Sequence, residues 1–444
     1  MPDGWIWTAL SDACYIELGQ SPPSSTYNTD GIGLPFFQGK AEFGDLYPTA
    51  VKWCSEPKKI AEDGDVLISV RAPVGSTNLN REKSCIGRGL AAIRPNDDMS
   101  NLYFLYLLRY IQQELIDQAT GTTFQAISGK VLREQKIPLA PPVEQHQIVA
   151  EIEKQFTRLD QAVASLQRLQ SNLARYKASV LKAACEGRLV PQDPNNEPAT
   201  DLLARVLAER RAQWEAANPK KKYKEPVGVK TAVLPDLPEG WVWARVDQLG
   251  EVRLGRQRSP KNHQGPHMHP YLRAANATWE GVDLSDVMEM NFSPKELEIY
   301  RLKQDDILLA EASGSANEVG KPFIWNEQIS DCCFQNTLIR VRLSNMPPNY
   351  LYLHFLKDAQ TGRLGEIAKG VGIHHLGANR LAEMPVAIPP LAEQERIVAE
   401  VERRLSVVAA TEQTITANLA RAERLRQSIL HRAFTGQLVP QQPA

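Results

Sequence analysis

The sequence predicts a mixed α/β protein in which two similar globular domains are separated by two long helices forming an antiparallel coiled coil, with a pseudo-twofold internal repeat. Three observations predict this fold. The chain repeats itself from end to end, each copy closes with a long segment that lacks glycine and proline, and each copy opens with short β-type runs. At 444 residues, the chain also exceeds what one hydrophobic core usually holds.

The internal repeat is carried by stretches that follow one another in the same order in both halves. The matching pairs are MPDGWIW at 1–7 with LPEGWVW at 237–243, DVLI at 65–68 with DILL at 306–309, NLYFLYLLR at 101–109 with NYLYLHFLK at 349–357, PPVEQHQIVAEIEK at 141–154 with PPLAEQERIVAEVER at 389–403, and GRLVPQ at 187–192 with GQLVPQ at 436–441. The chain therefore contains two copies of one unit.

The first part of each copy, at 1–143 and 237–391, predicts a globular domain. Runs such as VLISV and LAAIRP in the first copy, and ILLA and TLIRVRL in the second, are typical of strands, and Gly, Pro and Asn separate them. One helix is expected in each domain, near 101–118 and 349–360.

The last part of each copy, at 144–186 and 392–435, predicts a long helix. Apolar residues recur mostly three or four apart in both segments, which is the pattern of a coiled-coil seam. Gly187 and Gly436 follow the two segments as helix-terminating residues. A rod of 43 residues is about 65 Å long, so the natural partner for each apolar stripe is the other rod.

The connector at 187–236 favours antiparallel rods, because it then joins neighbouring helix ends. It holds an expected helix at 201–217 and the basic run PKKKYKEP at 219–226, and a short tail at 436–444 follows the second rod. Parallel rods would require the connector to return about 65 Å, a distance that roughly 50 extended residues can reach. Parallel pairing therefore stays open.

The composition indicates an ordinary globular protein, with 43% hydrophobic and 23% charged residues. No membrane-length apolar stretch or signal-peptide pattern is present, so a cytoplasmic location is expected. Six cysteines without CxxC spacing favour reduced thiols. Since the net charge is −1, binding to nucleic acid would require basic groups gathered on one face or supplied by a partner.

The repeated architecture suits a target with its own dyad, such as B-DNA, on which paired readers sit about 34–36 Å apart or a multiple of that distance. The GWxW openings, the IVAEIE and IVAEVE helix starts, the GRLVPQ and GQLVPQ helix ends, and DLLARVLAERRAQWEA ahead of KKKYKEP occur together here. In this combination the chain resembles the specificity subunits of type I restriction-modification systems over essentially its whole length.

The resemblance implies two target-recognition domains that each read one part of a split, asymmetric sequence in double-stranded DNA. It implies two modification subunits that methylate adenine with S-adenosylmethionine, and restriction subunits that translocate and cut DNA with ATP and Mg²⁺. The chain itself is expected to be non-enzymatic, without catalytic residues, bound cofactor or metal. Spacer helices of this family dock modification subunits, which would explain the outer-face residues Arg403, Arg404, Arg421 and Arg424.

If the chain reads DNA, polar and basic side chains on loops contact bases and phosphates. The candidates in domain one are Arg71, Lys83 and Arg88, with Thr122, Thr123, Gln125 and Lys130 of the loop GTTFQAISGK at 121–130. The candidates in domain two are Arg256, Arg258 and Lys261 of RLGRQRSPKNHQ, with Lys369, His374, His375, Asn379 and Arg380 of KGVGIHHLGANR at 369–380. The loops at 121–130 and 369–380 are favoured because they align ahead of the two spacer helices.

Other patterns favour structural interpretations. His263, His267 and His269 lack a Cys or acidic partner at ligand spacing, so a polar recognition loop is preferred to a zinc site. Cys332 and Cys333 lie in an apolar run that predicts a strand, where packing is their expected role. The GWxW tryptophans are interpreted as core anchors rather than base-stacking groups.

Two further function classes remain as alternatives. The runner-up is a coiled-coil adaptor whose globular ends bind proteins and which has no DNA role of its own. A self-contained nuclease is disfavoured, since the spacing of Asp45, Glu56 and Lys58 is of a kind that arises by chance and no phosphate-binding loop or nucleophile elbow is present. The basic run at 219–226 is interpreted as a connector that touches DNA or a modification subunit, or as a solvated linker.

Overall fold

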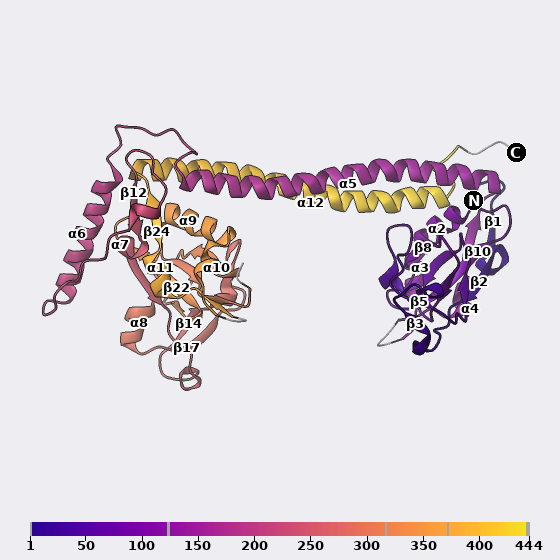
Figure 1. Ribbon diagram of the computed structural model, residues 1–444, viewed down its shortest axis with the longest axis horizontal. Helices are drawn as coiled ribbons and strands as arrows, with labels where there is room; N and C mark the ends of the chain where they lie inside the picture. Colours follow the sequence, from indigo (N-terminus) through magenta and orange to yellow (C-terminus); the bar gives the residue numbers. More distant parts are fainter. Residues whose placement is uncertain (1, 122–124, 316–317, 371–372, 441–444) are drawn as a thin grey trace. The chain divides into compact units, whose positions relative to one another are not determined.

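The computed structural model describes residues 2–121, 125–315, 318–370 and 373–440 (Figure 1). The chain divides into two compact units. Unit 1 comprises Met1–Arg168 and Thr414–Ala444, and unit 2 comprises Leu169–Gln413. Each unit holds one globular domain together with parts of two long helices, so the predicted fold class is confirmed.

The two long helices are α5, Pro142–Cys185, and α12, Leu391–Phe434, each of 44 residues. Both begin within two residues of the positions that the sequence predicts, which is the usual uncertainty of a helix end. Gly187 and Gly436 follow them with φ values of 68° and 72°, the left-handed conformation that glycine adopts without strain.

Within each unit the two long helices pack side by side and antiparallel. In unit 1, early residues of α5 meet late residues of α12: the Arg426 guanidinium lies 4.6 Å from the centre of the Phe156 ring and pairs with Asp160. In unit 2, a late residue of α5 meets an early part of α12, where Lys177 Nζ lies 2.8 Å from Glu412 Oε2. The antiparallel alternative is therefore the correct one.

The domain of unit 1 is built on a four-stranded antiparallel sheet in the order β2-β10-β7-β8. The strands of the whole domain are β1 (Ile6–Ala9), β2 (Cys14–Leu18), β3 (Tyr27–Asn28), β4 (Leu34–Phe37), β5 (Trp53–Cys54), β6 (Ile60–Ala61), β7 (Val66–Ser69), β8 (Thr77–Leu79), β9 (Ser84–Ile86), β10 (Leu90–Pro95) and β11 (Lys136–Leu139). Its helices are α1 (Leu10–Ala13), α2 (Asn101–Tyr110), α3 (Gln112–Asp117) and α4 (Gly129–Glu134), with 3₁₀ turns at Ser24–Thr26 and Lys40–Glu42.

The domain of unit 2 repeats that sheet in the order β13-β22-β18-β20. Its strands are β12 (Val242–Arg245), β13 (Gly250–Leu254), β14 (Met268–Leu272), β15 (Ala277–Thr278), β16 (Gly281–Val282), β17 (Met288–Asn291), β18 (Ile307–Ala310), β19 (Ala312–Ser313), β20 (Pro322–Ile324), β21 (Cys333–Phe334), β22 (Leu338–Leu343), β23 (His374–His375) and β24 (Pro385–Ile388). The helices of this domain are α7 (Val246–Leu249), α8 (Pro294–Tyr300), α9 (Pro348–Gln360), α10 (Arg363–Ile367) and α11 (Ala378–Glu383), and the connector ahead of it holds α6 (Ala199–Ala217).

The repeated aspartate of DVLI and DILL makes the same ion pair in both domains. Asp65 Oδ1 accepts a hydrogen bond of 2.8 Å from Arg94 Nε, and Asp306 Oδ1 accepts one of 2.7 Å from Arg342 Nε. Both carboxylates are buried. Each ion pair connects the residue just before β7 or β18 to the neighbouring strand, which is β10 in unit 1 and β22 in unit 2. This fixed pairing accounts for the repeat of the aspartate.

The repeat runs one residue out of the predicted register over helices α2 and α9. Tyr103 Oη donates to the Pro138 carbonyl at 2.9 Å, and Tyr350 Oη donates to the Ala387 carbonyl at 3.1 Å. These two tyrosines are therefore equivalent, whereas the sequence match pairs Tyr103 with Leu351. Similar apolar side chains fill both stretches, so the pattern alone does not distinguish the two registers.

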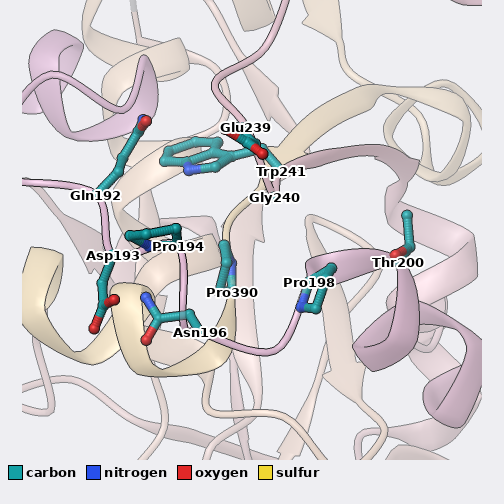
Figure 2. Close-up of a pocket in the computed structure, with 10 residues that line it drawn as sticks. All are labelled: Gln192, Asp193, Pro194, Asn196, Pro198, Thr200, Glu239, Gly240, Trp241 and Pro390. Atoms are coloured by element: carbon teal, nitrogen blue, oxygen red, sulfur yellow. The ribbon is translucent and has the colours of Figure 1, made fainter.

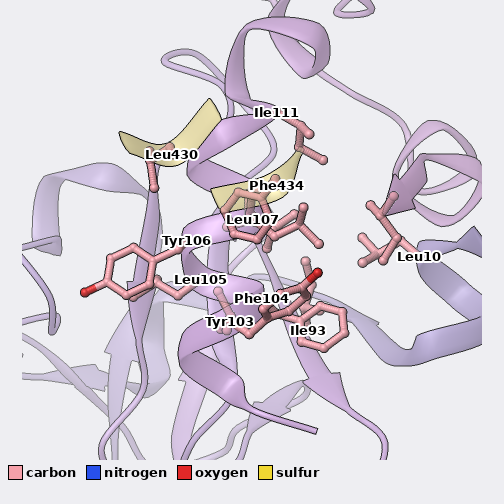
Figure 3. Packing of buried hydrophobic residues seen from close by; sticks show 14 of the residues in the cluster. Leu10, Ile93, Tyr103, Phe104, Leu105, Tyr106, Leu107, Ile111, Leu430 and Phe434 are labelled. Atoms are coloured by element: carbon pink, nitrogen blue, oxygen red, sulfur yellow. The ribbon is translucent and has the colours of Figure 1, made fainter. Parts of the chain in front are cut away.

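Helix α2 is the centre of the unit 1 core (Figure 3). Its residues from Tyr103 to Leu108 are all buried, so the helix is surrounded on most sides. The ring of Phe434, at the end of α12, meets Tyr103 edge-on at 5.2 Å and stacks on Tyr110 at 5.5 Å between centroids. The end of α12 thereby becomes part of the core of this domain.

The first tryptophan of each GWxW stretch anchors a core, as predicted. Trp5 and Trp241 are 6% and 7% exposed, and their indole nitrogens donate to the first-turn carboxylates of the long helices, Glu144 and Glu393, at 3.0 and 3.2 Å. The prediction is wrong for Trp7, which is 59% exposed. Tertiary contacts make this difference, since the equivalent Trp243 donates to the carbonyl of Pro235 in the connector.

The one helix expected near 101–118 is divided at Ile111 into α2 and α3, and domain one also contains α1 and α4. The predictions for the cysteines and the connector helix agree with the described part of the chain. All six cysteines are free and buried, and Cys332 and Cys333 pack at strand β21. Helix α6 begins two residues before the connector helix expected at 201–217. Across the residues that the structure describes, none of the helices combines the length and apolar character of a membrane span.

Candidate nucleic-acid interface

In domain one, the turn after strand β7 is bonded to the loop at 121–130. Ile127 N donates to the Val70 carbonyl at 3.0 Å, and Ala72 N donates to the Gln125 carbonyl at 2.9 Å. The turn at 70–72 and the loop at 125–130 form one surface, which is called the joined surface of domain one. Arg71 and Gln125 are both exposed on it, so the structure brings these two predicted residues together. Thr122 and Thr123 lie outside the described residues.

Lys130 extends the same surface from the first turn of α4. The helix is capped by Ser128, whose hydroxyl accepts from Val131 N at 3.3 Å. The Lys130 side chain is 79% exposed, and its ammonium lies 3.9 Å from Glu134, a distance that leaves its charge available to solvent or an anion. The position therefore suits a phosphate contact.

Lys83 and Arg88 flank the short strand β9 and are both exposed. Lys83 Nζ lies 3.2 Å from Glu62 Oε1, and both side chains are about half exposed. The backbone N–H of Arg88 donates to Ser21 Oγ at 3.2 Å, which fixes its loop but leaves the guanidinium to project from it. The loop of Arg88 is connected to the Arg71 turn, because Val70 N donates to the Gly89 carbonyl at 2.9 Å.

Domain two presents an equivalent joined surface. Leu376 N donates to the Glu311 carbonyl at 2.8 Å, as Ile127 does to Val70 in domain one. Lys369 and His375 then exchange backbone hydrogen bonds of 3.0 and 2.8 Å, and His374 pairs with Ser313 across β23 and β19. The two loops favoured by the sequence thus occupy equivalent places beside their sheets.

The side chain of His375 is oriented by a carboxylate that the sequence did not single out. His375 Nδ1 lies 3.0 Å from Glu311 Oε2, and Glu311 is only 9% exposed. The carboxylate holds the hydrogen on Nδ1, so the other ring nitrogen, Nε2, is left for an outside partner. The only sequence signal for Glu311 is its position directly after the strand ILLA.

Arg380 holds its own loop rather than projecting from it. Its Nε donates to the Leu376 carbonyl at 2.8 Å, and its guanidinium also donates to the His375 carbonyl. Asn379, the residue before it on α11, is exposed. Lys369, His374, His375 and Asn379 therefore stay predicted contacts, while Arg380 is bonded to the backbone of the loop at His375 and Leu376.

Arg256 corrects a sequence prediction. It is 9% exposed, with its Nε 2.7 Å from Glu296 Oε1, its Nη1 2.7 Å from the Asn291 carbonyl, and its guanidinium carbon 5.0 Å from the centre of the Phe292 ring. Because this charge is neutralised inside the domain, Arg256 supports the loop instead of reaching DNA.

The neighbours of Arg256 in the same loop stay predicted contacts. Arg258 and Lys261 are exposed, and Arg258 Nε lies 3.1 Å from His263 Nε2. Among the residues described, no group of three or more His, Cys, Asp or Glu side chains is placed to hold a metal ion. His267 instead fixes the loop through its backbone, donating to Asn291 Oδ1 at 2.8 Å.

The four arginines predicted for the spacer helices all lie on α12. Arg403 and Arg404 both bond Glu400, at 2.8 and 2.6 Å, and these hydrogen bonds lower the pKa of Glu400 to about 2. Arg403 remains 66% exposed, while Arg404 is 32% exposed. Arg421 and Arg424 are exposed as well. All four side chains can reach a partner.

A cavity of about 480 Å³ in unit 2 lies between the connector and the start of domain two (Figure 2). It is lined by Gln192, Asp193, Pro194, Asn196, Pro198, Thr200, Glu239, Gly240, Trp241 and Pro390. The lining holds two carboxylates and no lysine or arginine, so it is unsuited to phosphate and separate from the loops described above.

Comparison with known proteins decides the family. Residues 2–170 and 238–421 match the family described as type I restriction modification DNA specificity domain. The chain belongs to this family. As a specificity subunit, it is the DNA-recognition component of a type I restriction-modification system and is not a catalytic subunit. The adaptor alternative receives no support.

Named relatives agree with the assignment of a specificity subunit. A candidate MjaX specificity subunit of Methanocaldococcus jannaschii is 38% identical over 192 residues, which cover 43% of this chain and only 44% of that protein. The EcoKI specificity subunit of Escherichia coli K12 is 23% identical over 461 residues, covering 99% and 90%. The crystal structure of the HsdS subunit from Thermoanaerobacter tengcongensis has the same fold, with a TM-score of 0.56, 19% identity and 98% coverage of both chains.

Proposed function

We propose that this specificity subunit reads a split, asymmetric sequence in double-stranded DNA, with one domain for each part. The observation that carries the proposal is the pair of equivalent joined surfaces, one beside β7 and one beside β18. Their exposed side chains differ: Arg71, Gln125 and Lys130 in domain one against Lys369, His375 and Asn379 in domain two. Different donors and acceptors at equivalent positions recognise different base sequences.

The spacer helices fix the gap between the two parts of the target in this proposal. A straight helix of 44 residues is about 66 Å long, and paired helices bend less than a single one. The unspecified gap in the target is therefore constant, within the limits set by bending of the DNA.

The partners in this proposal are two modification subunits and the restriction subunits of the same system. The exposed arginines on α12 suit a partner with acidic side chains, because guanidinium groups form two-point hydrogen bonds with carboxylates. S-adenosylmethionine, ATP and Mg²⁺ belong to those partners and not to this chain.

Replacing Lys130 or Lys369 with alanine is expected to weaken DNA binding. Each change removes one phosphate contact, which lowers the salt slope of log K by about 1 and the affinity by roughly fivefold near 0.15 M salt. The measurement is fluorescence anisotropy of the complex with modification subunits, on target and scrambled duplexes between 50 and 200 mM salt.

Lys303→Ala is the matched control for that experiment. Lys303 is exposed and precedes the start of β18, whereas the loop at 369–380 lies beside the residues that follow the end of that strand. Its salt slope should equal that of the unchanged protein. Equal slopes for all three variants and the unchanged protein would remove these two loops from the DNA interface.

A further inference from the structure

A second cavity, of about 270 Å³, lies wholly within unit 1, where the domain meets the two long helices. Its lining residues are Lys40, Phe43, Gly44, Asp45, Ser76, Thr77, Arg109, Gln112, Phe156, Arg426, Gln427 and Leu430. Three of these side chains are cationic and one is a carboxylate. This excess of positive charge sets the cavity apart from the one in unit 2, whose lining holds two carboxylates and no lysine or arginine.

Arg109 is a mostly buried cation whose hydrogen bonds all go to uncharged oxygens. Its Nε donates to Thr77 Oγ1 at 3.2 Å, and its Nη2 donates to the backbone carbonyl of Asp45 at 2.8 Å. In the part of the chain that the structure describes, no carboxylate forms an ion pair with it. Burial is the main cause that lowers the pKa of Arg109, and the charge of Arg426 lowers it further, while Tyr106 and the carboxylate of Asp45 act in the opposite direction without reversing the shift.

A buried charge without a counter-charge is costly, and proteins ordinarily pair it. The other domain follows that rule. Tyr103 and Tyr350 are equivalent, so the position of Arg109 corresponds to Leu356, which is uncharged. The lysine beside it, Lys357, pairs with the buried Asp358 at 3.0 Å. At this position of the repeat, the unpaired cation is therefore present in domain one and absent from domain two.

The walls of the cavity are held in place by contacts of their own. Asn78 bonds Gly44 twice, accepting from its N–H at 3.0 Å and donating to its carbonyl at 2.9 Å. Arg426 lies over the ring of Phe156 and pairs with Asp160 at the rim. Arg109 and Arg426 are thus held by contacts of the fold, which is the arrangement that binds a small anion with little ordering cost, whereas Lys40 is exposed.

We propose that this cavity binds one oxyanion of the phosphate class, held by the guanidinium groups of Arg109 and Arg426 and by the ammonium of Lys40. Guanidinium forks match the oxygens of phosphate, and the bound anion supplies the negative charge that Arg109 lacks. The anion is a phosphodiester of the DNA backbone or free inorganic phosphate. In the first case the site rests on the proposed function and extends the DNA contact onto the spacer helices.

The test is calorimetric titration of the full chain with inorganic phosphate, at constant ionic strength maintained with chloride. Saturable binding is expected. Arg109→Met, which keeps the length of the side chain and removes its charge, should weaken binding about tenfold or more, as expected for a charge-assisted hydrogen bond. Lys40→Ala should weaken it less and, being a change at an exposed residue, leaves the fold intact.

Arg158→Ala is the control, because Arg158 is exposed on the same helix as Phe156 and does not line the cavity. It should bind phosphate like the unchanged protein. The proposal is overturned if binding does not saturate, or if Arg109→Met and Lys40→Ala both bind as the unchanged protein does.

A competition experiment separates the two sources of the anion. If a short duplex of unrelated sequence raises the apparent Kd for phosphate, the site takes a backbone phosphodiester. If the duplex binds without affecting phosphate, the site takes the free anion. Either result supports the cavity as an oxyanion site. Failure of sequence-specific methylation would not alter phosphate binding. Failure of the proposed function can therefore be distinguished from failure of the oxyanion site.

Discussion

Replacing Phe434 with alanine is expected to lower the free energy of unfolding of unit 1 by about 3–5 kcal/mol. Phe434 is 3% exposed and lies against Tyr103 and Tyr110, where it joins the end of α12 to the helix at the centre of the core (Figure 3). Alanine leaves a cavity at this junction, and the rigid neighbouring rings fill it only partly.

The measurement is urea unfolding followed by circular dichroism, with the two units fitted as separate transitions if they do not unfold together. Leu425→Ala is the control, because Leu425 is on the same helix but 48% exposed. It should cost less than about 1 kcal/mol. Equal losses from the two variants would show that the end of α12 is not part of the core.

Asp358→Ala is expected to destabilise unit 2 by about 3–5 kcal/mol at pH 7, since it leaves a buried charge cluster without its anion. The carboxylate is completely buried, 3.1 Å from His354 Nδ1, 3.0 Å from Lys357 Nζ and 3.4 Å from Arg363 Nη1. Asp236→Ala, at an exposed aspartate in the connector, should change stability by less than about 0.5 kcal/mol. Similar losses for both variants would contradict the account.

The same cluster makes unit 2 sensitive to acid. Burial alone would raise the pKa of Asp358, but the close contact with His354 Nδ1 and the neighbouring positive charges outweigh it, and the pKa falls well below its ordinary value. A depressed carboxyl pKa contributes stability above the unfolded pKa, near 4, and this contribution is lost as the pH falls further.

His354 acts in the same direction. Burial lowers its pKa below the ordinary value of 6.5, so protonation favours the unfolded chain and stability falls as the pH drops below about 6.5. Urea unfolding at pH 7, 5 and 3.5 should show a progressive loss in the unchanged protein. The loss below pH 4 should be smaller in Asp358→Ala, because that variant lacks the titrating carboxylate.

The fold could be predicted from the sequence because its signals are local or periodic. The internal repeat, the seam of apolar residues and the glycines after each long helix predicted α5 and α12 within two residues. The equivalence of the loops at 121–130 and 369–380 followed from their place ahead of the helices. Each of these features is a short pattern, or the recurrence of a short pattern, and both can be recognised in a single sequence.

The roles of individual side chains could not be predicted in the same way. Arg256 forms an ion pair with Glu296 and a hydrogen bond with the Asn291 carbonyl, and these residues lie 40 and 35 residues away along the chain. Arg380 looks like other exposed arginines in sequence, yet it is bonded to two carbonyls of its own loop. Such assignments depend on tertiary contacts that no local pattern records.

The central claim is that this specificity subunit directs adenine methylation to a split sequence with a constant gap. The most direct measurement is a genome-wide map of methylated adenines in the cell that carries the gene, with and without it, while the modification subunits are produced. The account predicts that one split motif with an unvarying unspecified gap loses its methylation when the gene is deleted. An unchanged methylation pattern under those conditions would contradict it.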